Sequence, residues 1–192
     1  MQALQMKNSN VYNINMATKE YRALFEWIGA VDYDVFATLR FNRNVSKQRV
    51  IEAVKRYLHI LDKKIMGRHN VRNDIRIERY VALENGTSNS NWHCHVLFNS
   101  SSTVATAEEL TTLAEHFWHR KVKDAKQYDR QNKSNGKFKL KQRQRDFELI
   151  EDNNNVKRYV IGEHYKLGND TILVECCYFS EDTQRLLKAN IG

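Results

Sequence analysis

The chain has no proline among its 192 residues, and it has only three cysteines. Without proline, its turns must be built from glycine, asparagine, aspartate and serine. Two of the cysteines, Cys176 and Cys177, are adjacent, which is the spacing of neither a disulfide framework nor a paired-cysteine zinc site. We therefore predict buried thiols in a reducing compartment.

Long apolar runs are also missing. No stretch approaches the roughly 20 apolar residues that a membrane-spanning helix requires. Residues 1–15 are polar and lack the apolar segment of a secretory signal. A phosphate-binding motif of the form G-x-x-x-x-G-K-[ST] is absent too, which argues against a nucleotide-driven motor in this chain. We expect a cytoplasmic protein with no membrane partner.

Positive charge is what the chain has in excess, and it is concentrated in one segment. The net charge is +8, and residues 120–145 alone contribute +9 through eleven lysines and arginines and two aspartates. In an extended chain the alternating cations of this segment form one edge that can follow phosphates. These cations are Lys137, Lys139, Lys141, Arg143 and Arg145. We predict a nucleic-acid-binding segment, and the alternative is a solvated charged loop.

The apolar pattern predicts a single domain that mixes strands and helices. Alternating apolar residues predict strands over 34–42, 75–83, 92–99, 146–150 and 171–179. Helical spacing predicts helices over 18–28, 47–65, 107–122 and 156–167, with a last one opening at Ser180. Ser46 and the run Asn153-Asn154-Asn155 are the expected N-caps of two of them. Residues 1–17 are expected to be a loose arm.

These elements predict the α+β class. Two strand-like runs flank the turn-rich segment 84–91, so 75–83 and 92–99 should form a hairpin. We expect a five-stranded antiparallel sheet with strands 34–42 and 92–99 in the centre and helices packed mainly on one face. This arrangement is ferredoxin-like or RRM-like.

The stretch 92–99, Trp-His-Cys-His-Val-Leu-Phe-Asn, carries the clearest chemical signal. Because side chains alternate along a strand, His93 and His95 should share one face while Cys94 packs into the core. Two imidazoles on one strand can bind one metal ion. Glu84 on the neighbouring strand is the favoured third ligand and Glu78 the alternative, since hairpin register is not determined by sequence alone. The competing interpretation is two surface histidines.

Two further motifs accompany the histidine pair, one before it and one after it. Residues 36–41, Phe-Ala-Thr-Leu-Arg-Phe, are similar to a strand motif F-x-T-L-T-F, and residues 158–162, Arg-Tyr-Val-Ile-Gly, are similar to a helical motif Y-V-x-K. With the His-x-His motif between them, residues 33–167 resemble the HUH endonucleases, more narrowly the rolling-circle replication initiators of phages, viruses and plasmids. Gly162 stands where the motif has lysine, and the nearest lysines are Lys157 and Lys166.

The resemblance implies a reaction and a set of site residues. Tyr159 would attack a phosphodiester of single-stranded DNA to give a 5′-phosphotyrosine and a free 3′-hydroxyl. His93, His95 and Glu84 would bind Mn²⁺ or Mg²⁺. The implied partners are single-stranded or hairpin origin DNA and the helicase and polymerase of a host, with the protein a monomer or weak dimer.

Several alternatives stay open at this point. Tyr165 lies six residues after Tyr159 and therefore on another face of the same predicted helix, so only one of them can easily reach the metal. A relaxase or a single-tyrosine transposase would use the same chemistry. A non-enzymatic module that binds single-stranded nucleic acid is the rival from another class.

We interpret His116 and His119 as surface or packing residues.

Overall fold

The structure is a computed structural model that describes residues 19–42, 44–85, 92–125, 146–167 and 171–189. Its strands are β1 (Val35–Leu39), β2 (Glu78–Asn85), β3 (Trp92–Asn99) and β4 (Phe147–Leu149). Its helices are α1 (Lys19–Gly29), α2 (Lys47–Ile65), α3 (Gly67–Arg72), α4 (Ala107–Lys121), α5 (Asn153–Leu167) and α6 (Glu181–Ala189). Two short 3-10 turns are η1 (Ser100–Ser102) and η3 (Val174–Cys176). The predicted arm 1–17 lies outside the described residues.

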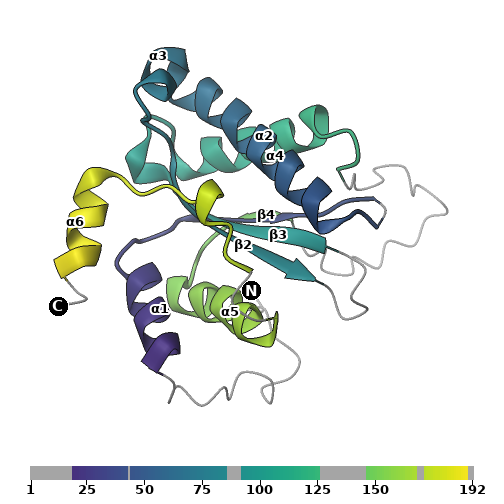
Figure 1. Ribbon diagram of the computed structural model, residues 1–192. Coiled ribbons are helices and arrows are strands. Elements are labelled where there is room, and N and C mark those ends of the chain that lie inside the picture. Colours follow the sequence, from purple (N-terminus) through teal and green to yellow (C-terminus); the bar gives the residue numbers. More distant parts are fainter. Residues whose placement is uncertain (1–18, 43, 86–91, 126–145, 168–170, 190–192) are drawn as a thin grey trace, which may run out of the picture.

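The four strands form one antiparallel sheet in the order β2-β3-β1-β4 (Figure 1). The α+β class is confirmed, and so are the β2-β3 hairpin and the central positions of β1 and β3. In the described part of the chain no helix combines the length and the apolarity that a bilayer span needs.

The prediction of a fifth strand over 171–179 is wrong. Ile172 bridges Ala82 and Tyr178 bridges Arg79, so six steps along this segment run beside only three steps of β2. The surplus residues fold into η3, which interrupts the ladder. The segment nevertheless covers part of the outer edge of β2, because Arg79 and Tyr178 exchange backbone hydrogen bonds of 2.9 and 3.0 Å.

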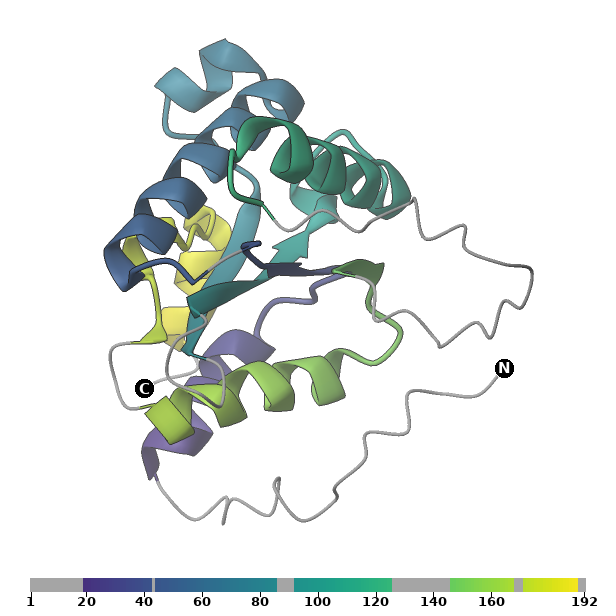
Figure 2. The ribbon, with the colours of Figure 1, turned by 90° about the vertical axis from the view of Figure 1, so that its right-hand side faces the viewer.

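Helices cover both faces of the sheet, contrary to the expectation that they pack mainly on one. Helices α2 and α4 lie on one face, and α1 and α5 lie on the other (Figures 1 and 2). The physical reason is that β1 is apolar on both faces. Val35, Ala37 and Leu39 pack against α2 and α4, whereas Phe36 joins a second core cluster with residues of α1 and α5.

The starts of the helices follow from capping side chains. The Ser46 hydroxyl accepts the backbone N–H of Arg49 at 3.2 Å and caps α2, as predicted. Helix α5 begins at Asn153 rather than 156, because the Asp152 carboxylate, and not the asparagine run, accepts the N–H of Asn155 at 3.1 Å.

Asn153 has a different role from the predicted cap. Its side-chain oxygen accepts the backbone N–H of Tyr33 at 3.2 Å, and its amide donates to the Tyr33 carbonyl at 2.5 Å. Tyr33 lies just before β1 in the chain. These two hydrogen bonds therefore tie the first turn of α5 to the start of β1, and they set the position from which α5 crosses the sheet.

A candidate metal centre beside Tyr159

The register of the β2-β3 hairpin decides which glutamate lies beside the histidine pair. Glu84 is directly opposite His93, and its Oε2 lies 2.6 Å from His95 Nε2 and 3.3 Å from His93 Nε2. Cys94 and Val96 point to the other face and are fully buried, as the alternation predicts. Of the two candidate third ligands, Glu84 is the one brought to the histidines.

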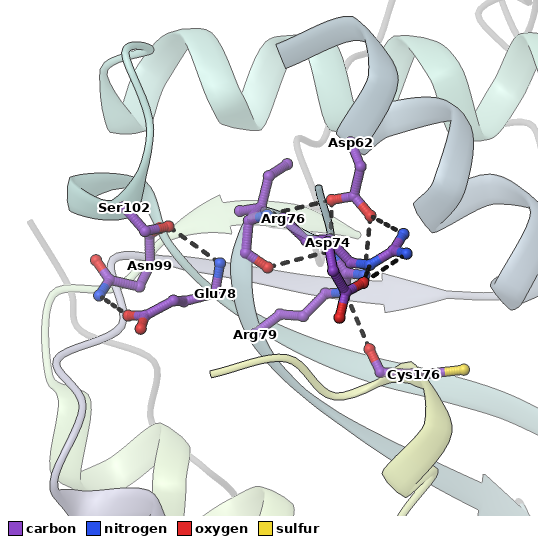
Figure 3. A network of polar contacts seen from close by, with 9 residues as sticks. Asp62, Asp74, Arg76, Glu78, Arg79, Asn99, Ser102 and Cys176 are labelled. Atoms are coloured by element: carbon purple, nitrogen blue, oxygen red, sulfur yellow. Dashed lines mark hydrogen bonds and ion pairs between the residues drawn. The ribbon is translucent and has the colours of Figure 1, made fainter. Parts of the chain in front are cut away.

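Glu78 lies at the far end of the same strand, opposite Asn99 (Figure 3). Its carboxylate accepts the Asn99 amide at 2.9 Å, the backbone N–H of Ser180 at 2.8 Å and the Thr183 hydroxyl at 2.6 Å. These partners belong to β3 and to the start of α6. Glu78 therefore attaches α6 to the sheet and is not part of the histidine cluster.

Glu84, His93 and His95 form the one group of three or more possible metal ligands found among the described residues. Their ligand atoms all lie within 4.8 Å of one another. Ligand atoms that share one octahedral ion at about 2.1 Å are themselves about 3 Å apart, so these three are close enough to be drawn onto a common ion. The arrangement is compatible with a divalent metal.

The protonation states of the cluster suit metal binding. Burial alone would raise the pKa of Glu84, but the hydrogen bonds and charges of His93 and His95 outweigh burial and hold that pKa well below its usual range. Burial lowers the pKa of His95 and so favours the neutral imidazole, although its hydrogen bond to Glu84 acts in the opposite direction. A carboxylate and a neutral imidazole are the forms that bind metal ions.

Strand β1, which pairs with β3 on the side away from β2, also contacts His95. Thr38 pairs with His95 across the sheet, and its Oγ1 lies 3.2 Å from His95 Nδ1. The Phe36 ring stacks on the His95 ring, with centroids 5.3 Å apart and planes 15° from parallel. Sequence reasoning used both residues as part of a motif but assigned them no contact, since strand register had to be known first.

Tyr159 comes to the same place from α5. Its hydroxyl lies 3.3 Å from His95 Nε2 and donates to Glu84 Oε2 at 3.4 Å. Its half-buried ring meets the edges of His95 and Phe36, with centroid distances of 5.1 and 6.2 Å. The helix thus carries the predicted tyrosine into contact with the predicted metal ligands. The side chain of Tyr165 is outside the described residues.

The other histidine pair is part of the packing, as we interpreted it. His119 lies 3.9 Å from Glu115 on its own helix, and its ring meets Phe147 of β4 at a centroid distance of 6.2 Å. His116 packs edge-on against Phe117. Neither histidine belongs to a metal-ligand cluster among the residues that the structure describes.

The five predicted DNA-contacting cations, Lys137, Lys139, Lys141, Arg143 and Arg145, lie outside the described residues. The residues on either side of segment 126–145 are described, and both sides meet β1 or the chain just after it. Ala125 bridges Phe41, and the Asp146 carbonyl accepts the backbone N–H of Thr38 at 2.6 Å. Because Thr38 contacts His95, Asp146 lies close to the histidine cluster.

Comparison with models of protein families, with curated proteins and with solved structures finds no match to this chain. Its function is therefore inferred from the residues of the site and their geometry.

Proposed function

We propose that this protein is a metal-dependent HUH-type endonuclease that nicks and rejoins single-stranded DNA through a phosphotyrosine, and so initiates rolling-circle replication of a phage, virus or plasmid in the cytoplasm of its host. The observation that carries the proposal is the position of the Tyr159 hydroxyl, within 3.4 Å of ligand atoms of both Glu84 and His95. A hydroxyl so placed can attack a phosphate that is bound at the same metal.

The nicking step exchanges one phosphodiester for another. The Tyr159 oxygen forms a bond to phosphorus while the bond from phosphorus to the 3′-oxygen breaks. The phenol loses one proton and the departing 3′-oxygen gains one, which leaves a 5′-phosphotyrosine and a 3′-hydroxyl. No oxidant, reductant or nucleotide is consumed. Attack of a 3′-hydroxyl on the phosphotyrosine reverses the step and rejoins the strand.

The residues of the site divide this work. Glu84, His93 and His95 would hold Mn²⁺ or Mg²⁺, which supplies positive charge to the phosphate oxygens. With the metal on Nε2 of His95, Nδ1 would carry the proton and donate to Thr38 Oγ1, 3.2 Å away, which would fix the tautomer and the ring plane. The Phe36 ring holds the same imidazole by stacking. Glu84 accepts the Tyr159 hydroxyl and so orients the nucleophile.

The distribution of charge supports DNA as the substrate. Residues 120–145 carry a charge of +9, and the described residues on both sides of 126–145 lie beside Thr38 and Phe41. Cations anchored there can bring a phosphate backbone to Tyr159. We assign this role to Lys137, Lys139, Lys141, Arg143 and Arg145. A host polymerase would extend the freed 3′-hydroxyl while a host helicase separates the strands, with the initiator acting as a monomer or weak dimer.

Two rival functions differ in a measurable product. A relaxase or a single-tyrosine transposase would form the same adduct but on transfer or element-end DNA, so the DNA that is selected distinguishes it from an initiator. A non-enzymatic nucleic-acid-binding module would form no covalent product. The contact of Tyr159 with the histidine cluster favours the enzyme, because pure binding does not require it.

The test uses a library of single-stranded oligonucleotides with a randomised centre, incubated with the protein and Mn²⁺. We expect a denaturation-resistant adduct that retains a 3′-end label and releases a 5′-end label, since the 5′-phosphate stays on the tyrosine. Tyr159→Phe and His95→Ala should abolish the adduct, and Tyr165→Phe should retain it. The sequence of the captured DNA then identifies the element.

Absence of any adduct on the library and on hairpin-forming DNA would contradict the enzymatic proposal. An adduct that survives Tyr159→Phe but not Tyr165→Phe would move the nucleophile to Tyr165.

A further inference from the structure

The spacing of the Tyr159 hydroxyl from the cluster is closer to that of a metal ligand than to that of a hydrogen-bonded partner. Its oxygen lies 3.3 Å from His95 Nε2 and 3.4 Å from Glu84 Oε2. A hydroxyl that makes a good hydrogen bond to oxygen lies about 2.5–3.0 Å from it. Two ligands that bind one ion at about 2.1 Å are about 3 Å apart in an octahedron and about 3.4 Å apart in a tetrahedron.

His93 provides a comparison within the same cluster. Its Nε2 lies 3.3 Å from Glu84 Oε2. The Tyr159 oxygen is therefore about as close to two of the ligand atoms as one predicted ligand is to another. An ion that draws in His93 needs to draw in Tyr159 by no greater an amount from Glu84.

Tyr159 also approaches from the side on which the ligand atoms converge. Thr38 contacts the other ring nitrogen of His95, Nδ1, and Phe36 stacks on the ring with an apolar face. The backbone that carries Tyr159 is fixed, because the next two residues of α5, Val160 and Ile161, are fully buried in the core. The helix thus presents a fourth oxygen to the three ligand atoms.

The charge of the site favours an anionic fourth ligand. The side chains of Glu84, His93 and His95 are only 14%, 11% and 3% exposed. A divalent ion bound by one carboxylate and two neutral imidazoles keeps one positive charge, and a charge left unbalanced in a mostly buried site is costly. A phenolate from Tyr159 balances that charge.

We propose that the Tyr159 oxygen is itself a ligand of the divalent ion that Glu84, His93 and His95 hold. The inference rests on the metal centre of the proposed function, but it requires no DNA and no nicking. The phenol gives its proton to solvent when the ion binds, as ligands that bind metals in deprotonated form do. The nucleophile is then ionised and in place before DNA arrives, and Glu84 orients it by sharing the ion with it.

The experiment uses Cu²⁺ as an optical probe, because this ion binds nitrogen and oxygen ligands strongly. Phenolate bound to Cu²⁺ gives an intense charge-transfer band in the visible range, which carboxylate and imidazole ligands do not give. With one equivalent of Cu²⁺ we expect this band in wild type. Tyr159→Phe should still bind Cu²⁺ but lose the band, and His95→Ala should lose both.

The matched control is Tyr178→Phe. Tyr178 is half-buried like Tyr159, but it lies beside Arg79, at the end of β2 far from Glu84. This variant should keep the band. In equilibrium titrations the affinity for Mn²⁺ should fall about 10-fold or more in Tyr159→Phe, since the loss of a residue that only supports a ligand already costs that much. The affinity of Tyr178→Phe should equal that of wild type.

The outcomes separate the ligand from the metal centre. A wild-type protein that binds Cu²⁺ through His95 without the band, or a band that survives Tyr159→Phe, would overturn the assignment of Tyr159. An unchanged Mn²⁺ affinity in Tyr159→Phe would overturn it as well. A wild-type protein whose binding of both ions is independent of His95 would remove the metal centre itself, and this ligand with it.

Discussion

Two clusters of buried polar side chains lie beside the same sheet. They differ in how their hydrogen-bond donors and acceptors are paired. In the first cluster, Asp62 is fully buried and accepts two hydrogen bonds from the Arg79 guanidinium, at 2.6 and 3.0 Å (Figure 3). It also accepts the backbone N–H of Ile77 at 3.2 Å. Arg79 donates in addition to the carbonyls of Cys176 and Ile77. In this cluster the negative charge of Asp62 and the positive charge of Arg79 pair with each other.

In the second cluster three potential ligands converge instead. Glu84 is shared as an acceptor between His93 and His95, and the Tyr159 hydroxyl approaches the same carboxylate. Glu84 keeps 14% of its side chain exposed, whereas Asp62 is completely enclosed. A paired and enclosed cluster stabilises the fold, while converging ligand atoms that solvent can reach favour the binding of a cation. Four experiments test this contrast, taken from the largest expected effect to the smallest.

Asp62→Ala should have the largest effect on stability. It leaves the Arg79 charge buried without its partner, and we expect the free energy of unfolding to fall by about 3–5 kcal/mol in denaturant titrations. The double variant Asp62→Leu/Arg79→Met should recover most of this loss. Asp74→Asn is the matched control, because Asp74 pairs with Arg76 while 80% exposed and should cost under about 1 kcal/mol. A small effect of Asp62→Ala would contradict the stabilising role assigned to the first cluster.

Mn²⁺ should stabilise the folded protein by binding at the second cluster. At about 100 times its dissociation constant a ligand specific for the folded state adds about 2.7 kcal/mol to the free energy of unfolding. We expect this gain in wild type and in Glu78→Gln, and its loss in Glu84→Gln and His95→Ala, by thermal unfolding with and without the ion. Equal stabilisation of all four proteins would place the metal elsewhere.

Glu78→Gln should weaken the attachment of α6 and change the response to acid. Burial alone would raise the pKa of Glu78, but hydrogen bonds from Ser180, Thr183 and Asn99 lower it below its ordinary value of 4.5. A lowered pKa contributes stability that is present above about pH 4.5 and is lost as the pH falls through the folded-state pKa. The substitution should cost about 1.5–2 kcal/mol at neutral pH.

The acid response of the free energy of unfolding provides the control for this variant. The difference between wild type and Glu78→Gln should shrink as the pH is lowered below 4.5, the ordinary value for a glutamate. Exposed Glu151 offers the comparison, and Glu151→Gln should match wild type throughout. A difference that stays constant with pH would show that the charge of Glu78 does not attach α6.

Tyr159→Phe should have the smallest effect on stability although it abolishes the adduct. The ring keeps its contacts with His95 and Phe36, and the hydrogen bonds of 3.3 and 3.4 Å that the hydroxyl makes are long ones at a half-buried position. We expect the free energy of unfolding to change by less than about 1 kcal/mol. A large loss of stability would identify Tyr159 as a structural residue and would blur the distinction between the two clusters.

Local patterns were predicted well from the sequence. His93 and His95 share a face and Cys94 lies in the core because the side-chain period of a strand is two, whatever surrounds it. Ser46 caps its helix because a hydroxyl before an apolar-periodic run satisfies a free N–H of the first turn. The concentration of positive charge in 120–145 is likewise a property of the chain alone.

Long-range relations were decided only by the tertiary structure. The choice of Glu84 over Glu78 depends on hairpin register, and a shift of one residue would have turned either side chain to the other face. The segment 171–179 has the composition of a strand, yet it has more residues than the edge of β2 beside it can pair. Thr38 and Phe36 come to the site through the pairing of β1 with β3, and Asn153 anchors the helix that brings Tyr159. The period of a strand is a local property, whereas register and helix placement depend on contacts between residues far apart in the chain.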